Sequence, residues 1–343
     1  MPPAGKEDVW EILSLFQSTD IVRRWFKERH NRSLNLERAT EIAACFLQGD
    51  QYFKSSQHAA DVVKPLLLYY GILSLSRGII LFLDPRKKEE SLSPSHGLSQ
   101  HEWRRAWSIG ATGFWSLMVS INHGTFEDLL TATGNKLTNS VGYFNQVLRR
   151  EKVLSLGSSD NGIIGMSDLI SRVEELANIY AECSGADPNV MPCVVGTQGT
   201  QYHVTVRHPD ALDEHFQLML RRRFKIPESA GIRPVFGQPP TAGFSIPFGA
   251  YDNGLPNVPH IENRSSSGHC IIAPWPNGGY LSPLLRYFLI SYMLGMVVRY
   301  YPSKWMNVLF GRQKGDAILP LARAAITLIE VGFPTEAVRA LSS

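Results

Sequence analysis

Residue types that bind anions occur in two stretches that lie far apart in the chain. His96 follows a polar loop, and Arg299, Tyr300 and Trp305 lie where an apolar helix meets Pro302. Because proline ends that helix, Arg299 lies one turn inside it and is expected to be buried. A buried arginine needs a partner, since an isolated buried charge is costly. We therefore predict that these four side chains converge on a nucleotide-like or phosphate-bearing ligand.

A structural role for the same residues remains open. In that interpretation the aromatic side chains fill the seam between helices, and Arg299 binds backbone carbonyls or a carboxylate. The candidate carboxylates in the N-terminal helices are Glu37, Glu41 and Asp84. A carboxylate partner would make the site structural, whereas an open pocket beside His96 would favour an anionic ligand.

A run of cations ends a predicted helix over residues 211–224. The run consists of Arg221, Arg222, Arg223 and Lys225. Positive charge at a helix C-terminus stabilises the helix by about 0.3–1 kcal/mol, which accounts for only one or two of these residues. The excess charge predicts an anionic partner, either nucleic acid or an acidic protein surface. A merely solvated helix end is the alternative.

Arg24 and His30 give the most specific hypothesis of an enzymatic function. Metal-independent helical-bundle ribonucleases of the HEPN type have an arginine followed a few residues later by a histidine. In those enzymes the arginine steadies the phosphate charge while the histidine moves the ribose proton. With ten histidines in the chain, such pairs also arise by chance. The ribonuclease hypothesis therefore requires the two side chains to lie together and face a cleft.

Helical periodicity dominates the first third of the chain and returns at its end. The predicted helices are 8–17, 21–29, 36–53 (interrupted at Gly49), 65–83, 167–185, 211–224, 281–299 and 317–331. Residues 193–207 predict two strands around a turn at 196–200, and short strands are expected at 244–248 and 269–274. Proline and glycine are dense between 227 and 283, which is typical of irregular structure.

These elements predict a mainly α protein with an α+β insertion, in which the N- and C-terminal helices pack into one bundle-like core. The expected segments are an N-terminal helical region at 1–185, a Pro/Gly-rich insertion at 186–280, and C-terminal helices at 281–343. Residues 65–83 and 281–301 are long enough to be considered as membrane spans. Each contains arginine, so we expect buried helices and no membrane association.

Composition limits the classes of protein that need to be considered. The 343 residues are 44% hydrophobic and 19% charged, which excludes long disorder, collagen and coiled coil. A net charge of +3 is too small to imply nucleic-acid binding without a local patch. The four cysteines are isolated, so no metal site is predicted, and a reducing, cytoplasmic location is expected. No phosphate-binding loop is present, and no cofactor is predicted.

Four short stretches resemble the signature sequences of the bacterial YaaC-like family. They are PLLLYYG at 65–71, DP at 84–85, SHGL at 95–98 and RYYPSKW at 299–305. Residues 10–18 and 167–176 are also similar, so the resemblance spans nearly the whole chain. It implies a bacterial, soluble, mostly helical protein of undefined activity, and it supplies no catalytic residues.

These observations favour a non-catalytic interaction or scaffold component of a bacterial complex. The expected partner is another protein or a second copy of the chain, and nucleic acid is an alternative partner. A role in phage defence or nucleic-acid handling is a hypothesis, and the HEPN-like endoribonuclease is the alternative function.

Overall fold

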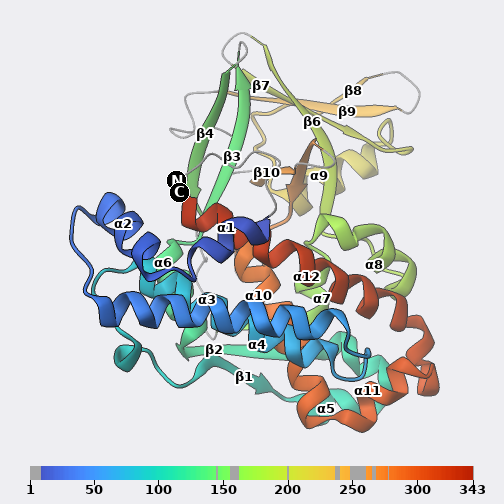
Figure 1. The fold of residues 1–343 in the computed structure, drawn as a ribbon. Helices are drawn as coiled ribbons and strands as arrows, with labels where there is room; N and C mark the ends of the chain where they lie inside the picture. The colour runs from blue at the N-terminus through green and yellow to red at the C-terminus, as the bar shows by residue number, and fades with distance from the viewer. Residues whose placement is uncertain are drawn as a thin grey trace. The chain divides into compact units, whose positions relative to one another are not determined.

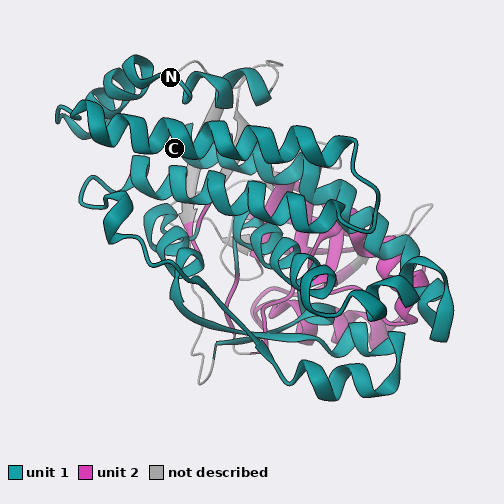
Figure 2. Cartoon of the chain, turned by 60° about the horizontal axis from the view of Figure 1, so that its bottom comes forward, with its two compact units in different colours: residues 1–135, 159–169, 281–343 teal, residues 136–158, 170–280 magenta. Residues whose placement is uncertain are grey.

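The computed structural model describes residues 9–143, 146–154, 162–198, 201–235, 240–247, 260–264, 268–276 and 278–342. The chain forms two compact units (Figure 2): residues 1–135, 159–169 and 281–343 make unit 1, and residues 136–158 and 170–280 make unit 2. Unit 1 is mainly helical and unit 2 is α+β, as the fold class predicted. The units differ from the three expected segments because a strand hairpin at 136–153 already belongs to unit 2.

The N-terminal part of unit 1 consists of four helices (Figure 1). They are α1 (Val9–Leu15), α2 (Thr19–His30), α3 (Leu36–Gln57) and α4 (Lys64–Leu83). Ser18 caps α2 by accepting a hydrogen bond from the backbone of Ile21, and Asn35 caps α3 in the same way. Pro65 lies in the first turn of α4, where its missing N–H has no cost.

Close packing of α3 against α4 explains why Gly49 does not interrupt α3. A Cβ at Gly49 would lie 2.6 Å from Leu75 Cδ2, and a Cβ at Gly71 would lie 2.8 Å from Phe53 Cδ2. Both glycines therefore allow the two helix backbones to approach closely. The prediction of an interruption was wrong because tertiary packing compensates for the low helix propensity of glycine.

The C-terminal helices of unit 1 return to the N-terminal ones, as predicted. They are α10 (Pro283–Tyr300), α11 (Pro302–Leu309) and α12 (Leu319–Ser342). Helix α10 is buried nearly all round and contacts α4 and α12, while α12 also contacts α1 and α4. Helix α4 and the segment Arg312–Ser342 are long and apolar enough to cross a membrane by length and composition. In unit 1, however, α4 packs against α3, α10 and α12.

A small antiparallel sheet in unit 1 has the strand order β1-β2-β5. Its strands are β1 (His96–His101), β2 (Met118–Gly124) and β5 (Ile163–Gly165), and α5 (Trp103–Ala106) and α6 (Thr125–Thr133) complete this region. The β1–β2 register shifts between His96 and Leu98. Gly97 has φ +76°, and a Cβ at Gly124 would clash with the backbone nitrogen of Gly97. Two glycines are therefore needed to make the irregularity that positions His96.

Unit 2 contains a six-stranded antiparallel sheet in the order β10-β11-β6-β7-β9-β8. Its strands are β6 (Val190–Gln198), β7 (Gln201–Arg207), β8 (Arg233–Val235), β9 (Thr241–Pro247), β10 (His260–Arg264) and β11 (Gly268–Ile272). The separate hairpin joins β3 (Lys136–Tyr143) to β4 (Gln146–Val153). Helix α9 (Glu214–Phe224) shares a hydrophobic core with β7 and β9 through Phe216, Leu220 and Phe224.

Two local predictions in this part of the chain were wrong. The helix predicted over 167–185 is broken into α7 (Met166–Ile170), a 3₁₀ turn at Glu174–Leu176 and α8 (Ala177–Ser184). Extended dihedral angles at Val173 end the helical path, and Arg172 turns inwards to donate to the carbonyls of Ala273 and Pro274. The turn expected at 196–200 is absent from Gly196 to Gln198, where β6 continues, and the last two residues of that prediction lie outside the described residues.

Candidate ligand-binding site

A buried tyrosine and a half-buried histidine form the centre of the candidate site in unit 1. Tyr69 comes from α4 and is 0% exposed, and its hydroxyl lies 2.6 Å from Nδ1 of His96 at the start of β1. The Tyr69 ring also packs edge-on against Tyr292 of α10, at 5.6 Å between ring centroids. A Cβ at Gly295 would lie 2.8 Å from Tyr69 Cβ, so the α4–α10 contact holds this ring in place.

Electrostatics keep both partners of this pair neutral at physiological pH. Burial raises the pKa of Tyr69, and its neighbours Tyr292 and Tyr70 raise it further, so the side chain remains a phenol. Burial also lowers the pKa of His96, and the positive charge of Arg299 lowers it further. In the described part of the chain, Tyr69 has no hydrogen-bond partner other than His96 Nδ1. Its hydroxyl must therefore donate to Nδ1, which places the imidazole proton on Nε2.

Arg299 lies beside this pair but is exposed, so the expectation that it would be buried was wrong. It belongs to the last turn of α10, where the helix leaves the core at Tyr300. Its Nη1 donates to the hydroxyl of Tyr70 at 2.7 Å, and its guanidinium lies 5.1 Å from the centre of the Tyr300 ring. These two contacts fix the guanidinium at the surface and leave most of its N–H groups available.

The carboxylates expected to pair with Arg299 make other contacts or lie elsewhere. Asp84 pairs with Arg86 at 2.9 Å, and Glu41 accepts a hydrogen bond from the backbone of Glu89. No ion pair joins Arg299 to an acidic side chain, Glu37 included, within the residues that the structure describes. Without a protein anion beside it, Arg299 can bind an anion from outside the chain.

Trp305 belongs to a different contact. Its side chain is buried in α11, and Nε1 donates to the backbone carbonyl of Asp61 at 3.0 Å. The structure therefore brings His96, Arg299 and Tyr300 together and assigns Trp305 to the support of the loop between α3 and α4. We define the ligand cluster as Tyr69, Tyr70, His96, Arg299 and Tyr300.

Two members of the ligand cluster, Tyr69 and Tyr70, were missed by sequence reasoning. They lie in the stretch 65–71, which its apolar character marked as a core helix. The signal that could have found them is the pair of hydroxyl groups in an otherwise apolar run, since a buried tyrosine hydroxyl needs a partner. The stretches 65–71, 95–98 and 299–305, on which the family resemblance rests, all contribute to this one cluster.

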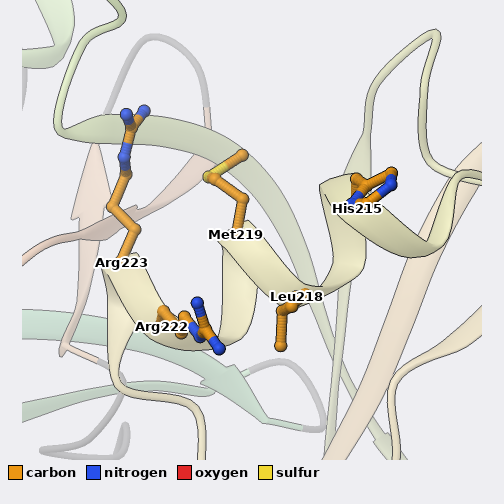
Figure 3. Close-up of a pocket in the computed structure, with 5 residues that line it drawn as sticks. All are labelled: His215, Leu218, Met219, Arg222 and Arg223. Carbon is orange, nitrogen blue, oxygen red and sulfur yellow. The ribbon is translucent and has the colours of Figure 1, made fainter.

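The cationic run on α9 divides into two kinds of residue. Arg221 donates to the carbonyls of Pro227 and Ala230, at 2.5 and 2.9 Å, and therefore ties the end of α9 to the next loop. Arg223 contacts Asp187 at 3.4 Å. Arg222 and Lys225 are exposed and form no ion pair with any described residue. An open hollow of about 550 Å³ lies here, lined partly by Arg222 and Arg223 (Figure 3).

Arg24 and His30 are not arranged as a ribonuclease site. His30 Nε2 donates to the carbonyl of Phe82 at 2.8 Å, and its ring packs on Phe26 with centroids 4.3 Å apart. His30 therefore satisfies a terminal carbonyl of α4. Arg24 is exposed, and no hydrogen bond or ion pair joins it to His30 in the described part of the chain. The pair thus gives no support to the HEPN-like alternative.

No group of three or more metal-binding side chains occurs among the described residues. The ligand cluster itself offers N–H and O–H groups and one cationic side chain, which suit an anion and not a cation.

Comparison with known proteins identifies a family. The model of the family described as YaaC-like Protein matches residues 14–341, which is nearly the whole chain. No curated protein and no solved structure matches the chain. The matched range begins near the end of α1, ends in the last turn of α12 and includes every residue of the ligand cluster, and the chain belongs to the YaaC-like protein family.

Proposed function

We propose that this YaaC-like protein is a non-catalytic interaction component of a bacterial complex that recognises a phosphate-bearing ligand through the ligand cluster. The observation that carries the proposal is the exposed guanidinium of Arg299. It is held by Tyr70 and Tyr300 and has no carboxylate partner among the described residues.

The guanidinium of arginine has five N–H donors in a planar fork, and this geometry matches two oxygens of a phosphate. One donor is engaged by Tyr70, and contact with the Tyr300 ring limits the rotamers of the side chain. Less conformational entropy is therefore lost when a ligand binds. The neutral imidazole of His96 adds one further N–H donor, on Nε2, close enough to Arg299 to be affected by its charge.

The protonation state of His96 supports recognition without catalysis. A histidine that acts as a general base must offer an unprotonated nitrogen to the reacting group. Here Nδ1 accepts the hydrogen bond of the buried Tyr69 hydroxyl, and Nε2 carries the proton. The lowered pKa of His96 also makes imidazolium, which is the general acid, scarce near neutral pH. His96 is therefore suited to donate a hydrogen bond and not to move a proton.

Calorimetric titration with adenosine monophosphate, and separately with inorganic phosphate, tests this proposal. We expect saturable binding of the nucleotide that weakens with salt. A charge-assisted hydrogen bond contributes about 1.5–3 kcal/mol, so Arg299→Ala should raise Kd by about 10- to 100-fold.

Arg312→Ala is the matched control for this titration. Arg312 is also exposed, and its guanidinium lies 5.7 Å from the ring of Phe310, as Arg299 lies over Tyr300. This variant removes the same charge and the same kind of aromatic contact, but no histidine accompanies it. Equal losses of affinity in the two variants, or no binding by the parent, would contradict the proposal.

The location and partners belong to the same proposal. We place the protein in the cytoplasm, bound to another protein or to a second copy of itself. None of the four cysteines, all of which lie in the described part of the chain, forms a disulfide, which is typical of a protein from a reducing compartment.

A further inference from the structure

Helix α9 in unit 2 has two different faces. Phe216, Leu220 and Phe224 are buried in the hydrophobic core that the helix shares with the sheet. On the other side, His215, Leu218, Met219 and Arg222 follow one another at the helical spacing i, i+3, i+4, i+7, which places them on one stripe. Figure 3 shows that these side chains and Arg223 all rise from this one helix.

The second stripe combines an exposed apolar centre with positive charge. Leu218 is 45% exposed, and Met219, beside it, packs partly against the core. His215, Arg222 and Arg223 line the same open hollow of about 550 Å³. The lining contains no acidic side chain. A partner that fits this surface must supply both apolar contact and negative charge.

Stabilisation of the helix end explains only part of this pattern. Asp213 caps the N-terminus of α9, and cations near the C-terminus complement the helix dipole. Arg221 and Arg223 also bind backbone carbonyls of neighbouring loops. Neither role accounts for an exposed leucine in the middle of the stripe, nor for Arg222, which forms no ion pair with any residue that the structure describes.

We propose that this stripe of α9 docks an acidic, amphipathic segment of a partner protein. An apolar side chain of the partner packs on Leu218 and Met219, and its carboxylates pair with Arg222, while Arg223 keeps its contact with Asp187 and adds positive charge beside them. An apolar centre with a charged rim is the common arrangement of protein interfaces. A phosphate backbone offers no apolar group for Leu218, so the exposed leucine favours a protein over a nucleic acid.

The test uses the full chain and three fluorescent probes. The first is a helical peptide with leucines on one face and glutamates beside them. The second is a scrambled peptide of the same composition, and the third is a single-stranded oligonucleotide of similar length. Fluorescence anisotropy at low and moderate salt should show that the amphipathic peptide binds more tightly than the other two, and that salt weakens its binding.

Two exposed substitutions on α9 locate the surface. Arg222→Glu should weaken binding of the amphipathic peptide by at least about 10-fold, and Leu218→Ser by about 5-fold. The matched controls in the same unit are Arg207→Glu, at the exposed end of β7, and Val194→Ser, at a position that is 54% exposed. Both control variants should bind the peptide as the parent does.

Several results would overturn the inference. Absence of peptide binding by the parent, or equal effects in the α9 variants and their controls, would exclude this docking surface. Tighter binding of the oligonucleotide with no effect of Leu218→Ser would make the stripe a nucleic-acid surface instead. Arg299→Ala should leave peptide binding unchanged. The test of the α9 surface is therefore independent of the proposal that the ligand cluster binds phosphate.

Discussion

Replacing Tyr69 by phenylalanine removes one hydroxyl group and keeps the ring that packs against Tyr292. The hydroxyl lies 2.6 Å from His96 Nδ1, and the tyrosine is completely buried. One buried hydrogen bond contributes about 0.5–1.5 kcal/mol net, so we expect the free energy of unfolding to fall by about 1 kcal/mol. Urea denaturation measures this change.

The same substitution should raise the pKa of His96. In the parent, protonation of Nδ1 would leave the Tyr69 hydroxyl without an acceptor, in addition to the effects of burial and of Arg299. Phenylalanine removes that penalty. The folded parent binds the His96 proton less readily than the unfolded chain does, so its stability should fall as the pH drops below the ordinary pKa of 6.5. This loss should be smaller in Tyr69→Phe.

Nitrogen-15 NMR of labelled histidine follows the titration and identifies the protonated nitrogen. Tyr292→Phe is the matched control, because the hydroxyl of this buried tyrosine donates to the Leu98 carbonyl at 3.1 Å and not to His96. It should leave the pKa of His96 unchanged. A proton on Nδ1 in the neutral parent, or a His96 pKa that falls or stays the same in Tyr69→Phe, would show that the Tyr69 hydroxyl does not donate to Nδ1.

Three further predictions concern the structure around the site. Gly295→Ala should lower the free energy of unfolding in urea by about 1–2 kcal/mol, because its Cβ would meet Tyr69 at 2.8 Å; a gain in stability would contradict the close α4–α10 contact. His30→Ala should lower the free energy of unfolding in urea by about 1–2 kcal/mol, because the Phe82 carbonyl loses its hydrogen-bond donor. The affinity of this variant for the nucleotide should not change. Ellman's reagent at pH 8 should label one thiol in the folded chain, the half-buried Cys183, and all four in urea; labelling of more thiols in the folded chain would show that the core opens.

The long helices could be predicted from the sequence because their periodicity and end signals agree. Ser18 and Asn35 cap helices where the chain has the appropriate residue types, and Pro65 begins the next one. The break near Val173 and the continuous helix through Gly49 could not be predicted in this way. Both depend on contacts with residues distant in sequence, which override local propensity.

The candidate site was predictable in composition but not in geometry. His96, Arg299 and Tyr300 do come together, although Arg299 is exposed and binds a tyrosine hydroxyl where a carboxylate was expected. Arg299 was expected to be buried because it lies one turn inside the helix, whereas the last turn of α10 extends to the surface. Trp305 was expected beside His96, but its indole N–H donates to the carbonyl of Asp61 in a distant loop. The spacing of residues in the sequence does not reveal such a contact.

Nitrogen-15 NMR of the His96 imidazole, recorded while adenosine monophosphate is added, tests phosphate recognition by the ligand cluster most directly. We expect a saturable change at Nε2 with its proton retained, no such change in Arg299→Ala, and recovery of the nucleotide intact after long incubation. Absence of a saturable change in the parent would contradict phosphate recognition at this cluster. Release of adenosine and inorganic phosphate by the parent but not by Arg299→Ala would show catalysis in place of recognition.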